Sequence, residues 1–267
     1  MNKAKEKAIE HWNKREYMPI NIPQSENPIK FSKFFSYASK SSFLYYPRKI
    51  IGYILKKILS HKYGSITYFF SHNERIIYNI IRKIKEEGRL LMEMNSGMQI
   101  YSSIKAISKI KGDIAEVGVS GGGSAKIICK TKELKKLYLF DTFEGLPFVC
   151  NEDSKRFKIG DFSNSLEGVK EYLKQYSNVF MYKGVFPESS EPIDNKRFSF
   201  VHLDVDTYQS TKNCLMFFYP RMVKGGMIFS HDYLNSKGVR KAFDEFFERK
   251  SELVLGLITN QCIVIKS

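Results

Sequence analysis

The residues best suited to chemistry are two carboxylates and an imidazole late in the chain. Asp204 ends one apolar run, and His231 and Asp232 end the next. Such a set resembles a facial metal site with open positions for water and substrate. Each residue also has a simpler interpretation, because Asp204 could cap a helix and His231 could be a hydrogen-bonded histidine at a strand end. We predict that Asp204 is a metal ligand and that Asp204 and His231 are the catalytic residues.

A further carboxylate, Asp206, follows in the stretch DVDTYQST. It could support the metal ligands. An aspartate at this position would also stabilise the start of the helix expected next, so both interpretations stay open.

A glycine-rich turn lies earlier, in GDIAEVGVSGGGSAKII, between an expected strand and an expected helix. Gly118 and the run Gly121 to Gly123 let the backbone approach a ligand closely, and the helix start offers unpaired N–H groups. Such a turn suits a nucleotide phosphate, a flavin or S-adenosylmethionine, and it can also be a purely structural turn.

Two acidic residues narrow the choice of ligand. Asp141 closes the second expected strand, where a carboxylate accepts hydrogen bonds from ribose hydroxyls. Glu116 ends the first strand, where it would repel a pyrophosphate but suit the cationic amino group of a methionine moiety, through water or nearby backbone. The pair favours S-adenosylmethionine over a dinucleotide.

The elements that must position these residues alternate along the chain from Gly112 onward. Short apolar runs predict strands at 113–119, 136–141, 178–184, 198–204 and 225–232, and helical patterns fall at 122–132, 163–176, 208–222 and 237–250. The chain closes with two more apolar runs, which predict an antiparallel hairpin: SELVLGLIT and QCIVIKS. The fold class is therefore α/β, with a mostly parallel Rossmann-like sheet and a terminal antiparallel hairpin, as in class I methyltransferases.

Several stretches together resemble the macrocin O-methyltransferase family. They are GDIAEVGVSGGGSA, LYLFDTFEGLP, GDFSNSLEGVKEYL, YKGVFPES, FVHLDVDTYQSTKNCLMFFYPRMVKGGMIFSHDY and GVRKAFDEF, in the same order and at plausible spacing over most of residues 95–250. The resemblance implies S-adenosyl-L-methionine as methyl donor, a sugar hydroxyl as acceptor, and magnesium held at Asp204, His231 and Asp232. His231 departs from the family pattern, which has aspartate there, and imidazole suits manganese better than magnesium.

The predicted cofactor site gathers residues from three segments of the chain. It comprises Glu116, Gly118, Ser120, Gly121, Ser124, Asp141, Thr142, Asp161 and Phe162. The long polar and aromatic segment TFEGLPFVCNEDSKRFKIGDF is expected to be a lid, with Phe143 and Glu144 at its hinge. Ser163 and Asn164 are expected to start the following helix.

Residues 1–99 are expected to form a mainly helical accessory segment, and residues 100–267 the methyltransferase domain. Residues 1–75 contain 14 Lys/Arg against 5 Asp/Glu, a large part of the net charge of +15. A stripe of isoleucine and leucine at 50–59 could lie on an anionic membrane, pack on its own domain or form a homo-oligomer contact.

The rest of the composition limits the functional class. No run is long enough to span a membrane, the first residues lack the apolar core of a signal peptide, and the four cysteines have no metal-ligand spacing, so a cytoplasmic protein is expected. A small molecule or glycan is the expected acceptor. A nucleic-acid methyltransferase is the less favoured alternative, since no recognisable RNA-binding module is present. A non-catalytic assembly or membrane-docking protein is the other.

Overall fold

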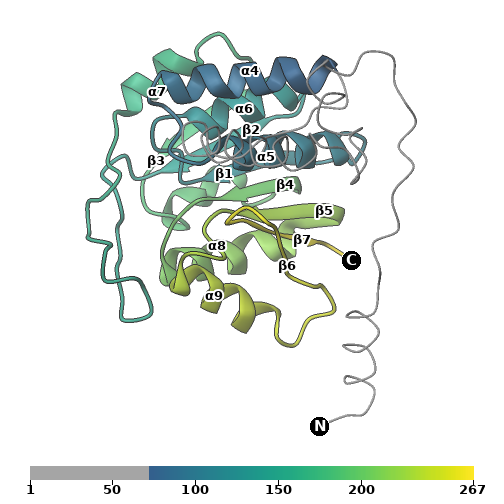
Figure 1. Ribbon diagram of the computed structural model, residues 1–267. Coiled ribbons are helices and arrows are strands. Elements are labelled where there is room, and N and C mark those ends of the chain that lie inside the picture. Colours follow the sequence, from purple (N-terminus) through teal and green to yellow (C-terminus); the bar gives the residue numbers. More distant parts are fainter. Residues whose placement is uncertain (1–71) are drawn as a thin grey trace, which may run out of the picture. The chain divides into compact units, whose positions relative to one another are not determined.

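The computed structural model describes residues 72–267, and a seven-stranded sheet forms their centre (Figure 1). The strands are β1 (Asp113–Val117), β2 (Leu137–Asp141), β3 (Val179–Lys183), β4 (Phe198–Leu203), β5 (Met222–Ser230), β6 (Leu255–Gly256) and β7 (Cys262–Ile265). Their order is β3-β2-β1-β4-β5-β7-β6. The first five pair in parallel, and β7 pairs antiparallel with β5 and β6. The predicted fold class is confirmed.

Helices cover both faces of this sheet. They are α4 (His72–Glu86), α5 (Met94–Ala106), α6 (Gly123–Thr131), α7 (Leu166–Leu173), α8 (Tyr208–Phe218) and α9 (Lys237–Phe247), with short 3-10 turns η1 (Glu188–Ile193) and η2 (Tyr219–Arg221). One core cluster combines α4 to α7 with one face of the sheet, and a second combines α8 and α9 with the other face.

The central strands are apolar on both faces because both faces are covered. β1 and β4 are buried along almost their whole length, as expected of strands inside a parallel sheet. Their register places Val117 beside Leu203, so the loops after these strands begin at the same edge. Asp204 N–H then donates to the Val117 carbonyl at 2.9 Å, and His231 N–H donates to the Leu203 carbonyl at 2.8 Å. The strand ends thus bring together residues far apart in sequence.

The element boundaries differ from prediction at a few places. Helix α7 begins after Ser165, whose hydroxyl accepts a hydrogen bond from Gly168 N–H at 3.1 Å, rather than at Ser163 or Asn164. Residue 100, at which the predicted methyltransferase domain begins, lies within α5, and the division of the chain there stays a prediction.

Some expectations cannot be compared with the fold. The apolar stripe at 50–59 and most of the expected accessory segment lie outside the described residues. Within 72–267, no helix has the length and apolar character required to cross a bilayer.

Candidate active site

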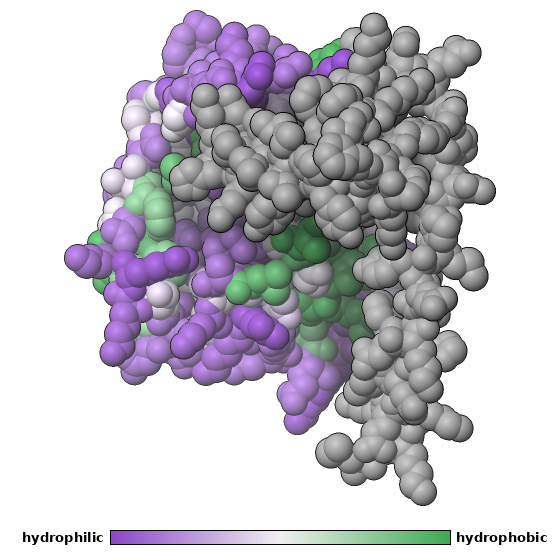
Figure 2. All heavy atoms as spheres, viewed as in Figure 1, coloured by the Kyte–Doolittle hydropathy of each residue, from purple (hydrophilic) through white to green (hydrophobic). Residues whose placement is uncertain are grey.

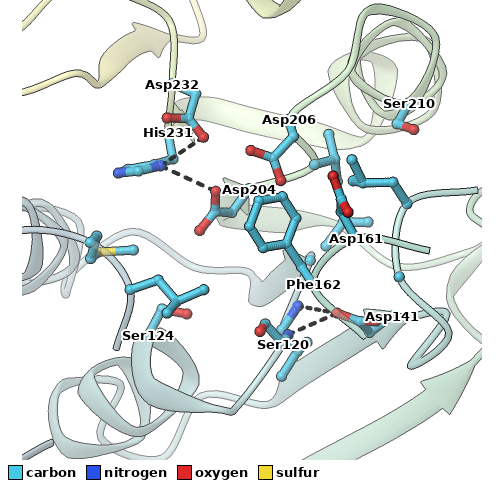
Figure 3. Close-up of a pocket in the computed structure, with 18 of the residues that line it drawn as sticks. Ser120, Ser124, Asp141, Asp161, Phe162, Asp204, Asp206, Ser210, His231 and Asp232 are labelled. Atoms are coloured by element: carbon cyan, nitrogen blue, oxygen red, sulfur yellow. Dashed lines mark hydrogen bonds and ion pairs between the residues drawn. The ribbon is translucent and has the colours of Figure 1, made fainter. Parts of the chain in front are cut away.

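A pocket of about 550 Å³ opens at the carboxyl edge of the parallel strands. Ligands bind at this edge in α/β folds because the loops that follow the strands converge there. The predicted site residues that line the pocket are Gly118, Ser120, Ser124, Asp141, Thr142, Asp161, Phe162, Asp204, His231 and Asp232. Figure 3 shows Ser120 and Asp141 on one side of the pocket and the His231 cluster on the other, with Phe162 between them in this view.

Asp141 holds the glycine-rich loop in place. Its Oδ2 accepts hydrogen bonds from the N–H groups of Val119 at 2.7 Å and Ser120 at 2.8 Å (Figure 3). Its Oδ1 accepts one from Phe143 N–H at 2.6 Å. An ionised carboxylate has about four acceptor sites, so capacity remains for a ligand hydroxyl. Asp141 therefore shapes the loop as well as facing the pocket.

Gly118 brings the loop after β1 against the loop after β4. Its φ is +87°, and a Cβ added there would lie 1.9 Å from the Asp204 carbonyl oxygen. Only glycine fits this contact, because any side chain would have to displace backbone. The glycine-rich turn is thus tied directly to the segment that carries Asp204.

His231 lies between two carboxylates. Its Nδ1 is 3.2 Å from Asp204 Oδ1 and 3.0 Å from Asp232 Oδ2 (Figure 3). Asp204 and Asp232 each offer a carboxylate oxygen, and His231 offers a ring nitrogen. These three atoms lie within 4.8 Å of one another. Two carboxylates and an imidazole at this spacing fit a divalent cation, and the imidazole favours manganese or iron over magnesium.

The electrostatics of this cluster depend on these short distances. Burial opposes the charging of His231, but Asp204 and Asp232 outweigh it and raise the pKa of His231 to about 11. Burial raises the pKa of Asp232, but hydrogen bonding and charge from His231 outweigh this and lower it overall. The two carboxylates thus favour a positive charge at this position in the pocket.

Asp206 also lines the pocket, close to this cluster (Figure 3). Burial, followed by repulsion from Asp204 and Asp232, raises the pKa of Asp206 well above its usual value. A hydrogen bond between the side chains of Asp206 and Asp232 contributes to the pKa shifts of both.

Glu116 is not among the residues that line the pocket, and its role towards the cofactor, through water or nearby backbone, stays a prediction. Its side chain is fully buried, and its Oε1 is 2.8 Å from Nδ1 of His202, which is also fully buried. The two residues are paired in register on neighbouring strands, and both side chains are buried against one face of the sheet. Alternation along β1 explains this direction, because Val117, the next residue, lines the pocket instead. Gly121 also lies outside the lining, although it belongs to the same turn.

The loop between β2 and α7 is folded back on itself. Leu146 N–H donates to the Asp161 carbonyl at 2.9 Å, and Gly160 N–H donates to the Leu146 carbonyl at 3.0 Å. These bonds close the base of a flap, defined here as residues 147–159. The expected hinge residues, Phe143 and Glu144, precede this base, and Glu144 pairs with Lys183 across 2.9 Å.

Some pocket residues were not singled out in the sequence. Arg89, which donates to the Gly121 carbonyl at 3.3 Å, lies before the first strand, where no motif indicated a role. Arg156 and Phe157 come from the flap, within a segment predicted only as a lid. Asn260 reaches the pocket from the hairpin turn.

Residues 94–263 match the model of one known family, described as macrocin O-methyltransferase. This stretch covers more than half of the chain. The chain belongs to the macrocin O-methyltransferase family. The resemblance predicted from sequence motifs is confirmed.

Two O-methyltransferases of known reaction are similar to this chain at modest identity. Mycinamicin III 3''-O-methyltransferase of Micromonospora griseorubida is 25% identical over 158 residues, which cover 52% of this chain and 62% of the relative. A rhamnosyl-tetracenomycin-C 4'-O-methyltransferase of Streptomyces olivaceus is 26% identical over 140 residues, which cover 46% of this chain and 54% of the relative. The match therefore spans less than two thirds of each relative.

Solved structures of O-methyltransferases share the fold of this family member. NovP aligns with a TM-score of 0.59 at 19% identity, covering 67% of this chain and 82% of NovP. The calicheamicin methyltransferase CalS11 aligns with a TM-score of 0.56 at 18% identity, covering 74% of this chain and 94% of CalS11. At such identities the comparison establishes the Rossmann-like fold alone.

Proposed function

We propose that this protein is an S-adenosylmethionine-dependent O-methyltransferase that acts on a sugar hydroxyl of a glycosylated small molecule or glycan. The observation that carries the proposal is a single pocket with a glycine-rich loop fixed by Asp141 at one side and the Asp204–His231–Asp232 cluster at the other. Family membership supports the donor and the reaction, and the relatives' names support a sugar-bearing acceptor.

The demanding part of this reaction is activation of the acceptor hydroxyl. S-adenosylmethionine supplies a methyl group that is already activated for in-line displacement. A sugar hydroxyl has a high pKa and must be polarised or deprotonated while held about 3 to 3.5 Å from the methyl carbon. A divalent ion held by Asp204, His231 and Asp232 would lower that pKa.

The chain's own residues divide the remaining work. Asp141 keeps the loop at Val119 and Ser120 in position for the donor. Asp204 and His231 both line the pocket and are the two candidates for the base that accepts the hydroxyl proton. The flap residues Arg156 and Phe157 wall the pocket and would limit access of water.

Calorimetry with S-adenosylhomocysteine tests the donor assignment. We expect dissociation constants in the micromolar range for S-adenosylhomocysteine and no comparable binding of NAD. Tight NAD binding without detectable S-adenosylhomocysteine binding would reject the proposal.

The acceptor class needs a transfer assay. Labelled methyl transfer from S-adenosylmethionine should be measured with rhamnosides, other glycosides and nucleotide-linked sugars, each with added manganese or magnesium. Label that enters glycosides supports the proposal. A protein that binds S-adenosylhomocysteine tightly but transfers no label to any of them would favour the non-catalytic alternative, and Asp204→Asn is the matched inactive control.

A further inference from the structure

The flap reaches across to the second helical layer through one buried carboxylate. Asp153, at the middle of the flap, is only 8% exposed, and its Oδ1 accepts a hydrogen bond from Tyr208 N–H at 2.7 Å. Tyr208 is the first residue of α8, so this N–H has no partner within the helix. Thr207, which occupies the N-cap position, makes no side-chain capping bond. A residue 55 positions earlier thus caps α8.

The other oxygen of Asp153 holds the flap in its own turn. Oδ2 accepts hydrogen bonds from Cys150 N–H at 2.9 Å and from the Cys150 thiol at 3.1 Å. Burial, together with the neighbouring carboxylate, raises the pKa of Cys150 to about 11, so the thiol remains a donor at neutral pH. One carboxylate therefore joins the flap turn to the helix.

Helix α9 leaves room for this contact. A Cβ added to Gly238 would lie 2.0 Å from Asp153 Oδ1 and 2.9 Å from Tyr208 N. An exposed ion pair between Glu152 and Lys241, at 3.2 Å, lies beside it. Exposed ion pairs contribute little to stability, so the contact between the flap and the helices depends mainly on the buried Asp153 carboxylate.

We propose that Asp153 is a positioning residue that latches the flap to α8 and so fixes one wall of the pocket. The flap supplies Arg156 and Phe157 to the pocket, and its base leads to Asp161 and Phe162. At the other end of the latch, α8 directly follows the segment Asp204–Asp206. The latch thus links the wall of the pocket to the loop that carries the predicted metal ligand. Its effect on the cofactor rests on the proposed function.

Limited proteolysis of the full chain reads the latch directly. Lys155, Arg156 and Lys158 are exposed trypsin sites immediately after Asp153. Cleavage requires several residues to leave the folded surface, so the rate reports local release of the flap. We expect Asp153→Ala to accelerate cleavage at these sites at least about tenfold without ligand, which follows if one buried charge-assisted contact is lost. Asp153→Asn retains a hydrogen-bond acceptor, so its cleavage rate should fall between those of wild type and Asp153→Ala.

Two further variants separate latching from general stability. Gly238→Ala keeps every hydrogen-bonding group but displaces the Asp153 carboxylate, and should reproduce the fast cleavage. Two control variants should be cleaved at the wild-type rate. Gly168→Ala also adds a methyl group in a helix, but that methyl meets only ordinary contacts. Glu152→Gln removes only the ion pair with Lys241. Because Asp153→Ala and Gly238→Ala act on the same contact, the double variant should be no faster than either single variant.

The outcomes are distinct. Unchanged flap cleavage in folded Asp153→Ala or Gly238→Ala protein would overturn the latch. Equal acceleration at Lys170 in α7 and at Lys174 just after it would also overturn the latch, because it would indicate general destabilisation. We also expect S-adenosylhomocysteine to bind Asp153→Ala several-fold more weakly, with partial rescue in Asp153→Asn. If wild type shows a latched flap but binds no S-adenosylhomocysteine, the proposed function fails and the latch stands.

Discussion

Asp141 combines two roles within one carboxylate. It accepts three backbone hydrogen bonds that fix the glycine-rich loop and the start of the next segment, and it faces the pocket. The sequence predicted only contact with a ribose. The structure adds that a ligand bound there meets a loop already held in shape, which lowers the entropic cost of binding.

Replacement of Asp141 should therefore weaken cofactor binding in two ways. Asp141→Ala removes a charge-assisted acceptor, worth about 1.5 to 3 kcal/mol, and also frees the N–H groups of Val119 and Ser120. Calorimetry should show at least a several-fold rise in the dissociation constant of S-adenosylhomocysteine. Asp194→Ala, at a surface position outside the pocket lining, is the control and should bind as wild type does. Equal affinity in the two variants would contradict this role.

Asp204 should affect the metal and turnover more than the cofactor. Asp204→Asn removes one anionic ligand while preserving shape, so manganese affinity measured by calorimetry should fall, and kcat should fall with little change in S-adenosylhomocysteine affinity. Chelation should abolish activity, with manganese restoring it better than magnesium because His231 supplies a nitrogen ligand. Full activity after exhaustive chelation would argue against a catalytic metal. His231→Ala would then be the informative variant.

At the scale of elements, the close contact at Gly118 joins the cofactor loop to the segment that carries Asp204. Gly118→Ala would press a Cβ onto the Asp204 carbonyl oxygen, 1.9 Å away, at a φ of +87°. We expect a loss of about 1 to 3 kcal/mol in the free energy of unfolding, together with weaker binding of both S-adenosylhomocysteine and manganese. Gly88→Ala is a matched control, because Gly88 has a φ of +71° and no heavy atom within 4 Å of its added Cβ. Thermal unfolding and calorimetry of the two variants measure the difference.

The sequence predicted the elements better than the directions of individual side chains. Apolar runs and glycine positions located β1 to β5 and the closing hairpin, because burial on both faces leaves a strong local pattern. The same pattern gave no sign that Glu116 points into the core, since that depends on which face of β1 is presented to His202. Asp153 was missed for a related reason. Its partner Tyr208 lies 55 residues away, and no local motif encodes such a distant cap.

At the scale of the whole molecule, the last strand is fastened to the rest of the fold by Glu252. Its buried side chain accepts hydrogen bonds from Lys266 Nζ at 2.7 Å, the Ser267 hydroxyl at 2.9 Å and the Tyr219 hydroxyl at 2.9 Å. Burial raises the pKa of Glu252, but these bonds outweigh it and hold the pKa well below its usual value near 4.5. The end of β7 thus depends on an ionised carboxylate.

This arrangement predicts a loss of stability in acid that is separate from the pocket. Because the folded pKa of Glu252 is lowered, its contribution is fully present above about pH 4.5 and is lost as the pH falls through the range below that value. At pH 7, Glu252→Gln should therefore lower the free energy of unfolding by about 1.5 to 3 kcal/mol, and the difference from wild type should shrink towards pH 3. Glu171→Gln, which removes an exposed pair with Lys174, should change little at either pH. Urea unfolding at pH 7, 5 and 3 measures both variants, and a difference for Glu252→Gln that stays constant with pH would show that hydrogen-bond geometry, not charge, fastens the strand.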